Sequence, residues 1–336
     1  MEPLQRFFSD NAAPVHPAVM DALERANRVD TAYDGDGLTA RLDGLFSDLF
    51  QTTAYALWVP TGTAANGLAL GAYVRPWQSV LCHDEAHIEV DECGAPALFT
   101  GGAKLHLLPG DGAKISAAAV DDAMASMRGD VHQVAPGAIS ITNASEYGLA
   151  WTPDEVAAIG DAARRHALPL HMDGARFANA IAHIGCSPAD VTWRAGVNAL
   201  SFGCVKNGGM NTEALIFFGP PPPGVAEMRK RTGHLQSKGR FLAAQIIALV
   251  EGGLWLDNAR GANHAAAIIG AAAGARLLYP VQANEVFLRL APAEAATLRA
   301  AGFDFYDWGH GAARLVTSWH HRPADVQPLA DAITAL

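Results

Sequence analysis

The sequence predicts an α/β fold with a mostly parallel sheet in a large domain and a smaller α+β domain at the C-terminus. Strand-like and helix-like patterns alternate through the first two-thirds of the chain, and the pattern changes after the prolines at 220–223. Half of the 336 residues are hydrophobic, and a chain of this length usually divides its core. Such alternation is typical of parallel sheets with helices on both faces. We expect a large domain over 1–249, including a short N-terminal arm, and a small domain over 250–336.

The elements of the large domain follow from the spacing of their apolar residues. Leucines and Phe46 recur at helical spacing over 38–49, ahead of the first strand. Further helices are expected at 116–127 and 153–166, and the second begins at Thr152-Pro153, a cap with proline in the first turn. The predicted strands lie at 54–59, 79–82, 104–108, 138–142, 169–173, 198–203 and 213–218.

The C-terminal third has a different pattern. A long helical region over 225–277, interrupted near Gly252-Gly253, precedes the small domain. Strands are predicted there at 286–290, 303–308 and 314–319, with helices at 292–301 and 323–335.

Charge and composition restrict the class of partner. The net charge is −10 and no basic run occurs, so we expect no nucleic-acid partner. The apolar stretches at 241–250 and 265–275 are too short to cross a bilayer, so we expect no membrane partner. The first eight residues lack the apolar core of a signal peptide, and the four cysteines are scattered without CxxC spacing. We therefore expect a cytoplasmic protein.

Two predicted strands end in residues of complementary chemistry. One runs into Asp173-Gly174-Ala175-Arg176 and another into Lys206-Asn207-Gly208. A lysine amine can form an imine with the aldehyde of pyridoxal phosphate, and a carboxylate can hold the ring nitrogen protonated. Taken alone, a structural aspartate and a solvated lysine are the commoner explanation. The rest of the chain decides between them.

A phosphate site is indicated where the strand at 54–59 passes into a helix. The turn Pro60-Thr61-Gly62-Thr63 would place free N–H groups and the positive end of a helix dipole at that point. An ordinary helix cap explains the same residues equally well. Neither GxGxxG nor GxxxxGK[ST] occurs, so a nucleotide is not indicated.

The densest polar cluster runs over 83–92 and has three interpretations. His83 and His87 at i and i+4 could bind a metal with the nearby acids, although Asp84 stands where the zinc-peptidase motif has Glu. A solvated helix start is a second possibility. In the third, the His87 imidazole stacks on a planar cofactor ring.

Two lone polar residues beside apolar runs, Ser9 and Arg314, complete the candidate set. An arginine entering a strand is usually a solvated edge residue. An active site for a carboxylate, however, needs a guanidinium that donates two parallel hydrogen bonds.

In their order along the chain, these pieces resemble the low-specificity L-threonine aldolase family of pyridoxal-phosphate enzymes, which has the fold-type I, aspartate-aminotransferase-like architecture. Each matching stretch is weak alone, but together they span nearly the whole chain. They are Phe8-Ser9-Asp10, Tyr33-Asp34-Gly35-Asp36, Pro60-Thr61-Gly62-Thr63 with Asn66, Ala86-His87, Asp173-Gly174-Ala175-Arg176, Ser201-Phe202 with Lys206, and Arg314-Leu315-Val316-Thr317.

The resemblance implies a role for each candidate. Lys206 would bond to the cofactor, Asp173 would pair with the ring nitrogen, and His87 would stack on the ring. Arg176 would support the ring oxygen. The remaining roles are phosphate binding by Gly62, Thr63 and Lys238, carboxylate binding by Ser9 and Arg314, and lining of the site by Tyr33. Family members assemble as homotetramers, dimers of dimers with sites shared between subunits.

The implied reaction is cleavage of L-threonine, L-allo-threonine or a related β-hydroxy-α-amino acid such as phenylserine to glycine and an aldehyde. One departure from the family leaves the base for the β-hydroxyl open, because Asn143-Ala144-Ser145 stands where many members have Asn-Thr-His. The same cofactor also supports β-elimination, racemisation and transamination. Two alternatives belong to other functional classes. The chain could be a metal-dependent hydrolase built on His83, His87 and the nearby acids, or a catalytically inactive binding protein.

Overall fold

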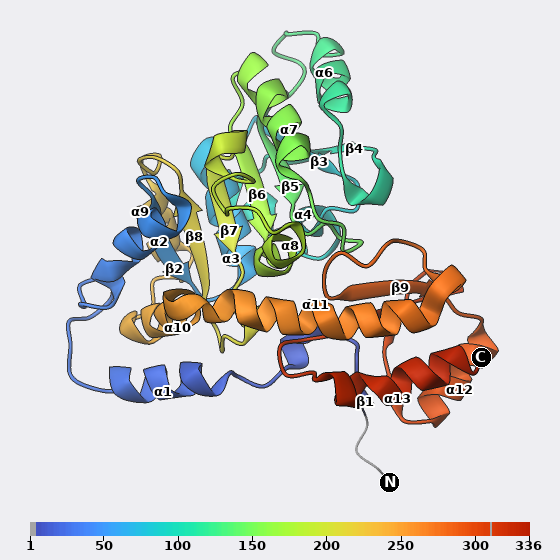
Figure 1. Ribbon diagram of the computed structural model, residues 1–336. Coiled ribbons are helices and arrows are strands. Elements are labelled where there is room, and N and C mark those ends of the chain that lie inside the picture. The colour runs from blue at the N-terminus through green and yellow to red at the C-terminus, as the bar shows by residue number, and fades with distance from the viewer. Residues whose placement is uncertain (1–4, 310) are drawn as a thin grey trace.

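The computed structural model describes residues 5–309 and 311–336, and a seven-stranded sheet forms its centre (Figure 1). The strand order is β2-β8-β7-β6-β5-β3-β4. Of these strands, only β8 runs antiparallel to its neighbours, β2 and β7, so the mostly parallel sheet is confirmed. The strands are β2 (Tyr55–Val59), β3 (Gln78–His83), β4 (Lys104–Leu108), β5 (Ala135–Thr142), β6 (Leu170–Gly174), β7 (Ala199–Phe202) and β8 (Glu213–Phe217).

Helices cover both faces of this sheet, which is why its central strands are apolar at nearly every position. Along β7, Leu200 and Phe202 face one hydrophobic cluster while Ala199 faces another. The first face is covered by α1 (Pro17–Ala26), α2 (Leu42–Phe50), α6 (Ala117–Ala125), α7 (Pro153–Arg165), α8 (Phe177–Ile184) and α10 (Arg240–Val250). The second is covered by α3 (Gly62–Tyr73), α4 (His87–Val90), α5 (Ala95–Thr100) and α9 (Val225–Arg231).

The C-terminal part has its own hydrophobic cluster around a three-stranded antiparallel sheet of order β11-β12-β9. These strands are β9 (Glu285–Arg289), β11 (Tyr306–Asp307) and β12 (Ala312–Val316), packed with α12 (Pro292–Ala300) and α13 (Pro323–Thr334). The long helix α11 (Leu254–Ala273) joins the two parts, as Figure 1 shows, because Trp255 belongs to the first cluster and Ile269 to the C-terminal one. The division into domains at 249/250 stays a prediction. The first four residues of the predicted large domain lie outside the described residues.

The N-terminal arm runs along the C-terminal part. Strand β1 (Gln5–Arg6) pairs in parallel with β10 (Phe303–Asp304), and the Val316 N–H donates to the Phe7 carbonyl at 2.7 Å. This anchoring leads the chain directly to Ser9 and Asp10.

Three predicted elements differ from the structure. The helical region over 225–277 is also broken at 232–239, where Gly233 has a φ of +83° that a helix does not allow. The strand predicted at 303–308 is two short strands, because β10 pairs with β1 and β11 pairs with β12. The last strand ends at Val316, since the Thr317 hydroxyl turns to donate to the Ala262 carbonyl at 2.7 Å.

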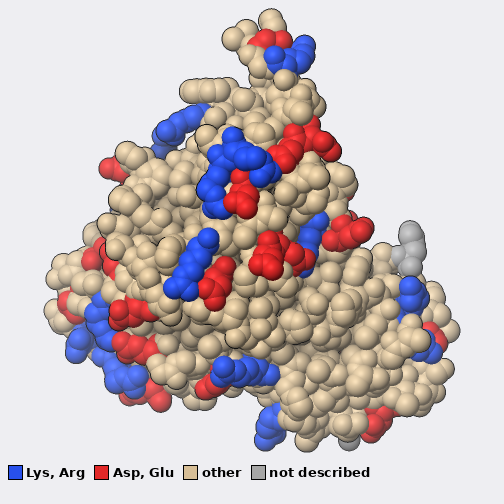
Figure 2. Space-filling model, turned by 45° about the horizontal axis from the view of Figure 1, so that its top comes forward, with Lys and Arg blue, Asp and Glu red and all other residues tan. Residues whose placement is uncertain are grey.

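The surface and the helices agree with the charge and hydropathy of the sequence. On the face shown in Figure 2, acidic and basic side chains are interspersed across broad uncharged areas. In the part of the chain that the structure describes, no helix combines the length and the apolar character needed to cross a membrane.

Candidate active site

Asp173 lies at the carboxyl end of β6 and is buried. Its Oδ1 accepts from the Ala175 N–H at 2.9 Å and its Oδ2 from the Asn66 side-chain amide at 2.7 Å. Burial would raise the pKa of this carboxyl, but the charge of His87 and these hydrogen bonds outweigh burial and lower it. Asp173 is therefore ionised at neutral pH, as a partner for a protonated ring nitrogen must be.

Lys206 follows the neighbouring parallel strand, so the carboxyl ends of β6 and β7 bring the acid and the lysine to the same edge of the sheet. Its loop is held firmly. Glu213 accepts from the amides of Cys204 and Val205, and Asn207 donates to the Trp255 carbonyl at 2.8 Å. The turn also needs glycine at 203, because a Cβ there would lie 2.2 Å from the Ala175 carbonyl oxygen.

The N-terminus of α3 forms an anion site beside this pair. Thr61 caps the helix by accepting from the Ala64 N–H at 3.1 Å, while the N–H groups of Gly62 and Thr63 have no acceptor within the described residues. A Cβ at Gly62 would meet nothing within 4 Å, so the approach is open. Asn66, the partner of Asp173, follows one turn later, about 6 Å along the helix axis.

His87 begins α4 and lies in the same cluster. Its Nδ1 is 3.1 Å from Glu92 Oε1, which also accepts from Asn66 at 2.8 Å. Burial alone would lower the pKa of His87, but the bond to Glu92 and the charge of Asp173 raise it. The imidazole is thus fixed in orientation and favours the protonated form.

The structure does not bring the two histidines of the metal hypothesis together. His83 Nε2 is bonded to the Gly110 carbonyl at 2.8 Å, and its Nδ1 accepts from the Glu85 N–H at 3.0 Å. Within the described residues, the group whose donor atoms do converge, within 4.8 Å, is His87, Glu92 and Asp173. The hydrogen bonds from His87 and Asn66 account for that convergence, so we assign no metal to it.

Two arginines form a second corner of the cluster. Arg176 is bonded to Asp10 by its Nε at 2.8 Å and its Nη2 at 3.0 Å, and its Nη1 is 3.3 Å from Glu285. Arg314 Nε lies 4.0 Å from the same Glu285 and has no hydrogen-bond partner within the described residues. The Arg314 Nη2 donates a long bond of 3.4 Å to the Phe8 carbonyl, and Nη1 has no hydrogen-bond partner within the described residues, so Nη1 is left to donate to a carboxylate ligand.

Aromatic rings and the N-terminal arm position these groups. The Arg314 guanidinium lies 5.6 Å from the Tyr306 ring centre and 5.4 Å from that of Trp308. Ser9 precedes Asp10 in the chain, and its hydroxyl accepts from the Asn11 N–H at 3.2 Å, which caps the turn that begins at Asp10.

Tyr33 and Lys238 are not brought to this cluster by their own chain. The Tyr33 N–H donates to the Ser237 carbonyl at 3.0 Å, and its half-exposed ring lies beneath Lys230, 5.0 Å away. Lys238 is exposed in the same segment.

Sequence reasoning gave no role to four acids of the site: Asp10, Glu92, Glu146 and Glu285. Glu285 had a detectable signal, since an acid enters a buried strand of apolar residues there. Asp10 belongs to the matching stretch Phe8-Ser9-Asp10, but its partner Arg176 is 166 residues away. Local sequence does not reveal such pairs.

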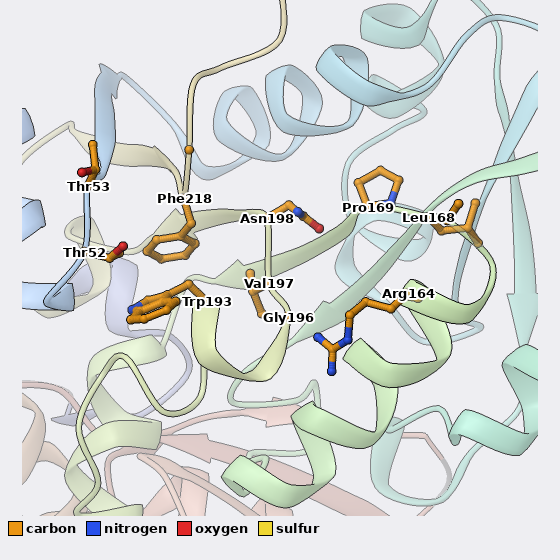
Figure 3. A pocket seen from close by; sticks show the side chains of 13 residues that line it. Thr52, Thr53, Arg164, Leu168, Pro169, Trp193, Gly196, Val197, Asn198 and Phe218 are labelled. Atoms are coloured by element: carbon orange, nitrogen blue, oxygen red, sulfur yellow. The ribbon is translucent and has the colours of Figure 1, made fainter.

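A separate recess lies at the opposite edge of the sheet (Figure 3). Trp193, Asn198 and Phe218 line it, and these residues precede β7 or follow β8. The Trp193 indole donates to the Phe50 carbonyl at 2.8 Å and the Asn198 amide oxygen accepts from the Leu170 N–H at 2.8 Å. This recess is remote from Lys206 and is held by structural hydrogen bonds.

The residues present fit pyridoxal phosphate: an open helix N-terminus for the phosphate, an ionised buried aspartate bonded to Asn66 one turn into that helix, and a lysine that follows the adjoining strand. A serine palmitoyltransferase from S. paucimobilis with bound pyridoxal phosphate has the same fold, with a TM-score of 0.71 at 15% identity, covering 99% of this chain and 87% of that one. The chain thus has the fold-type I architecture of pyridoxal-phosphate enzymes.

Sequence relatives narrow the assignment from a fold to a family. The Beta-eliminating lyase family matches residues 6–292, and the low specificity L-threonine aldolase of a Pseudomonas species is 41% identical over 339 residues, 99% of this chain and 98% of that protein. The Leishmania major threonine aldolase structure has a TM-score of 0.92 at 28% identity, covering 98% and 99%. This chain belongs to the beta-eliminating lyase family, in its low-specificity L-threonine aldolase branch. It is a carbon–carbon lyase whose cofactor is pyridoxal phosphate.

Proposed function

We propose that this chain cleaves L-threonine, L-allo-threonine or a related β-hydroxy-α-amino acid, such as phenylserine, to glycine and an aldehyde. One observation carries the proposal. Asp173 is hydrogen-bonded to Asn66, which lies one turn from the open N-terminus of α3, and Lys206 follows the strand next to that of Asp173. This arrangement supplies the cofactor's three attachment points within one rigid sheet edge.

The cofactor residues act as follows. Lys206 would hold the cofactor through its side-chain amine. Asp173 would keep the ring nitrogen protonated, His87 would cover the ring, and Arg176, which is anchored by Asp10, would support the ring oxygen. Gly62 and Thr63 donate N–H groups to the phosphate. When bound, pyridoxal phosphate withdraws electrons from the α-carbon of the attached amino acid.

Arg314 and Ser9 hold the substrate carboxylate. A planar carboxylate accepts two parallel hydrogen bonds from a guanidinium, and this fixes rotation about the bond from nitrogen to Cα. The Cα–Cβ bond can then be held in the orientation in which it breaks most readily. Arg314 thus positions the reacting bond.

The complete site is proposed to contain two copies of the chain. Tyr33 and Lys238 lie at the surface, away from their own Lys206 cluster, so they are available to the site of a partner subunit within a homotetramer. A cytoplasmic location is supported by the four cysteines, which lie within the described residues and form no disulfide.

A product assay on purified protein tests the reaction. With pyridoxal phosphate present, glycine and the matching aldehyde should appear in equal amounts from L-threonine, L-allo-threonine or phenylserine. Formation of ammonia and a keto acid would instead indicate β-elimination. A keto acid with a newly aminated acceptor would indicate transamination, and formation of the diastereomer inverted at Cα without cleavage would indicate racemisation.

A further inference from the structure

We propose that Glu146 is the base that takes the proton from the β-hydroxyl of the substrate. The inference rests on the proposed function and assigns the one chemical role in it that has no residue. Glu146 lies in the loop that follows β5, and its Oε1 accepts from the His87 N–H at 3.1 Å. It therefore belongs to the Lys206–Asp173 cluster.

The loop holds Glu146 in place without neutralising it. The Ser145 N–H donates to the Leu149 carbonyl at 2.8 Å and the Ser145 hydroxyl to the Gly112 carbonyl at 2.7 Å, while the Tyr147 ring stacks on Tyr279 at 4.6 Å. These contacts fix the residues on either side. The side chain between them stays partly accessible, as a group that meets substrate must be.

The other acids of the cluster are held by two donors or by a charged side chain, and the oxygens of Glu92 and Glu285 that have no partner among the described residues are fully buried. Glu213 accepts from two backbone amides, those of Cys204 and Val205. Asp173 and Glu92 both accept from Asn66, and Glu92 also from His87. Asp10 and Glu285 face arginines. Within the described residues the one hydrogen-bond partner of Glu146 is the backbone amide of His87, so an oxygen of its partly accessible carboxylate is left to accept a proton.

The surroundings of Glu146 suit a proton acceptor near neutral pH. Burial and the negative charge of Asp173 raise its pKa to about 7, Glu285 adds to this, and the charges of His87 and Lys206 oppose it. A base works best when its pKa lies near the operating pH. His87 is a poorer candidate, because its raised pKa favours the cation, which has no lone pair to accept a proton.

The step balances without another reactant. The carboxylate of Glu146 accepts the hydroxyl proton, and the electron pair of that O–H bond becomes the second bond of the aldehyde carbonyl. The pair of the broken Cα–Cβ bond stays on Cα. Glu146 returns its proton to solvent and Cα takes up a proton separately, so glycine and aldehyde contain all the atoms of the substrate.

The variant Glu146→Gln tests this role, because glutamine keeps an acceptor for the His87 N–H but cannot take a proton. We expect kcat for threonine cleavage to fall about 10²–10⁴-fold, the usual contribution of a positioned acid or base. Exchange of the glycine α-proton with deuterated solvent involves no β-hydroxyl and should fall far less. Glu146→Asp, which keeps an ionisable group, should retain part of the cleavage and its rise with pH.

A measurement without turnover checks the same carboxyl. The pKa of Glu146 is raised in the folded chain, so the stability that its protonated form contributes to wild type should be lost as pH rises through about 7. Glu146→Gln has no proton to lose there and should not show this loss of stability. Both proteins are unfolded in urea at matched cofactor concentration. The urea concentration at the unfolding midpoint of the variant should rise relative to that of wild type between pH 5 and pH 8.

The outcomes separate this inference from the proposed function. Wild-type cleavage rates in Glu146→Gln, or equal losses of cleavage and glycine exchange, would overturn the role of Glu146 alone. A wild type that cleaves no β-hydroxy amino acid would overturn the proposed function and this inference with it.

Discussion

The partner of each buried carboxylate near Lys206 decides which of them stay charged. Asp10 is almost completely buried, yet two bonds from Arg176 and one of 3.0 Å from Asn284 surround it. Burial would raise the pKa of Asp10, but the charges of Arg176 and Lys206 lower it below the usual range. The Asp10–Arg176 pair is therefore a permanent support of the site.

Asp10→Asn should destabilise the chain by about 3 kcal/mol at neutral pH, because removing one partner leaves the buried Arg176 charge short of compensation. The folded-state pKa of Asp10 is lowered, so its contribution to stability is present above the unfolded value and is lost as pH falls through the folded value. Urea unfolding of wild type and variant measures this difference. It should be full at pH 7 and shrink only below about pH 4.

A matched change at an exposed pair serves as the control for Asp10. Asp121 accepts from Arg165 at 2.6 Å and His166 at 2.7 Å on the surface, and Asp121→Asn should change the unfolding free energy far less. Equal losses in the two variants would show that burial of the Asp10–Arg176 pair does not matter.

At the scale of residues, the sequence predicts which functional side chains lie at the ends of buried strands. Asp173 and Lys206 were found because each follows a buried strand and its chemistry is specific. The neighbours that tune them were not, since Asn66 lies 107 residues from Asp173 and pairs with it only through the sheet. Tyr33 and Lys238 lie at the surface, away from the cluster of their own chain, and their proposed place in a partner's site comes from the resemblance alone.

At the scale of elements, the N-terminus of α3 carries the most specific expectation. Thr61→Ala removes the hydroxyl that accepts from Ala64, and the loss of such a cap costs about 1 kcal/mol of helix stability. The same change loosens the turn that presents the Gly62 and Thr63 amides. Both the unfolding free energy and the affinity for pyridoxal phosphate should fall.

Thr152→Ala is the control, because Thr152 caps α7 in the same way, accepting from the Glu155 N–H at 3.3 Å. We expect a similar loss of stability there with cofactor affinity unchanged. Calorimetric titration with the cofactor, together with urea unfolding, distinguishes the two variants. Unchanged affinity in Thr61→Ala would place the phosphate elsewhere.

The strands of the large sheet were predictable because both of its faces are buried, which leaves continuous apolar runs. Short elements that depend on distant pairing were not. Strand β10 exists because residues 5–6, at the other end of the chain, lie against it. The break after α9 depends on one glycine conformation, which the apolar pattern does not record.

At the scale of the whole molecule, Tyr33 and Lys238 test whether each site needs two chains. Lys206→Ala and Tyr33→Ala should each be nearly inactive alone. If Tyr33 serves the site of a partner, refolding them together should give hybrids with one intact site, and random pairing would restore about a quarter of wild-type activity. If Tyr33 serves its own chain, each of the two sites in a hybrid carries one of the two defects, and mixing restores nothing.

Covalent mapping of the cofactor tests the central claim most directly, since the whole account depends on Lys206 facing Asp173. The protein is incubated with pyridoxal phosphate, reduced with borohydride, digested and analysed by mass spectrometry, with Lys206→Ala and Lys238→Ala treated in parallel. We predict that the pyridoxyl group is on Lys206 in wild type and in Lys238→Ala, and that Lys206→Ala loses both the label and glycine release from threonine. A stoichiometric label on any other lysine, with Lys206→Ala still active, would contradict the account.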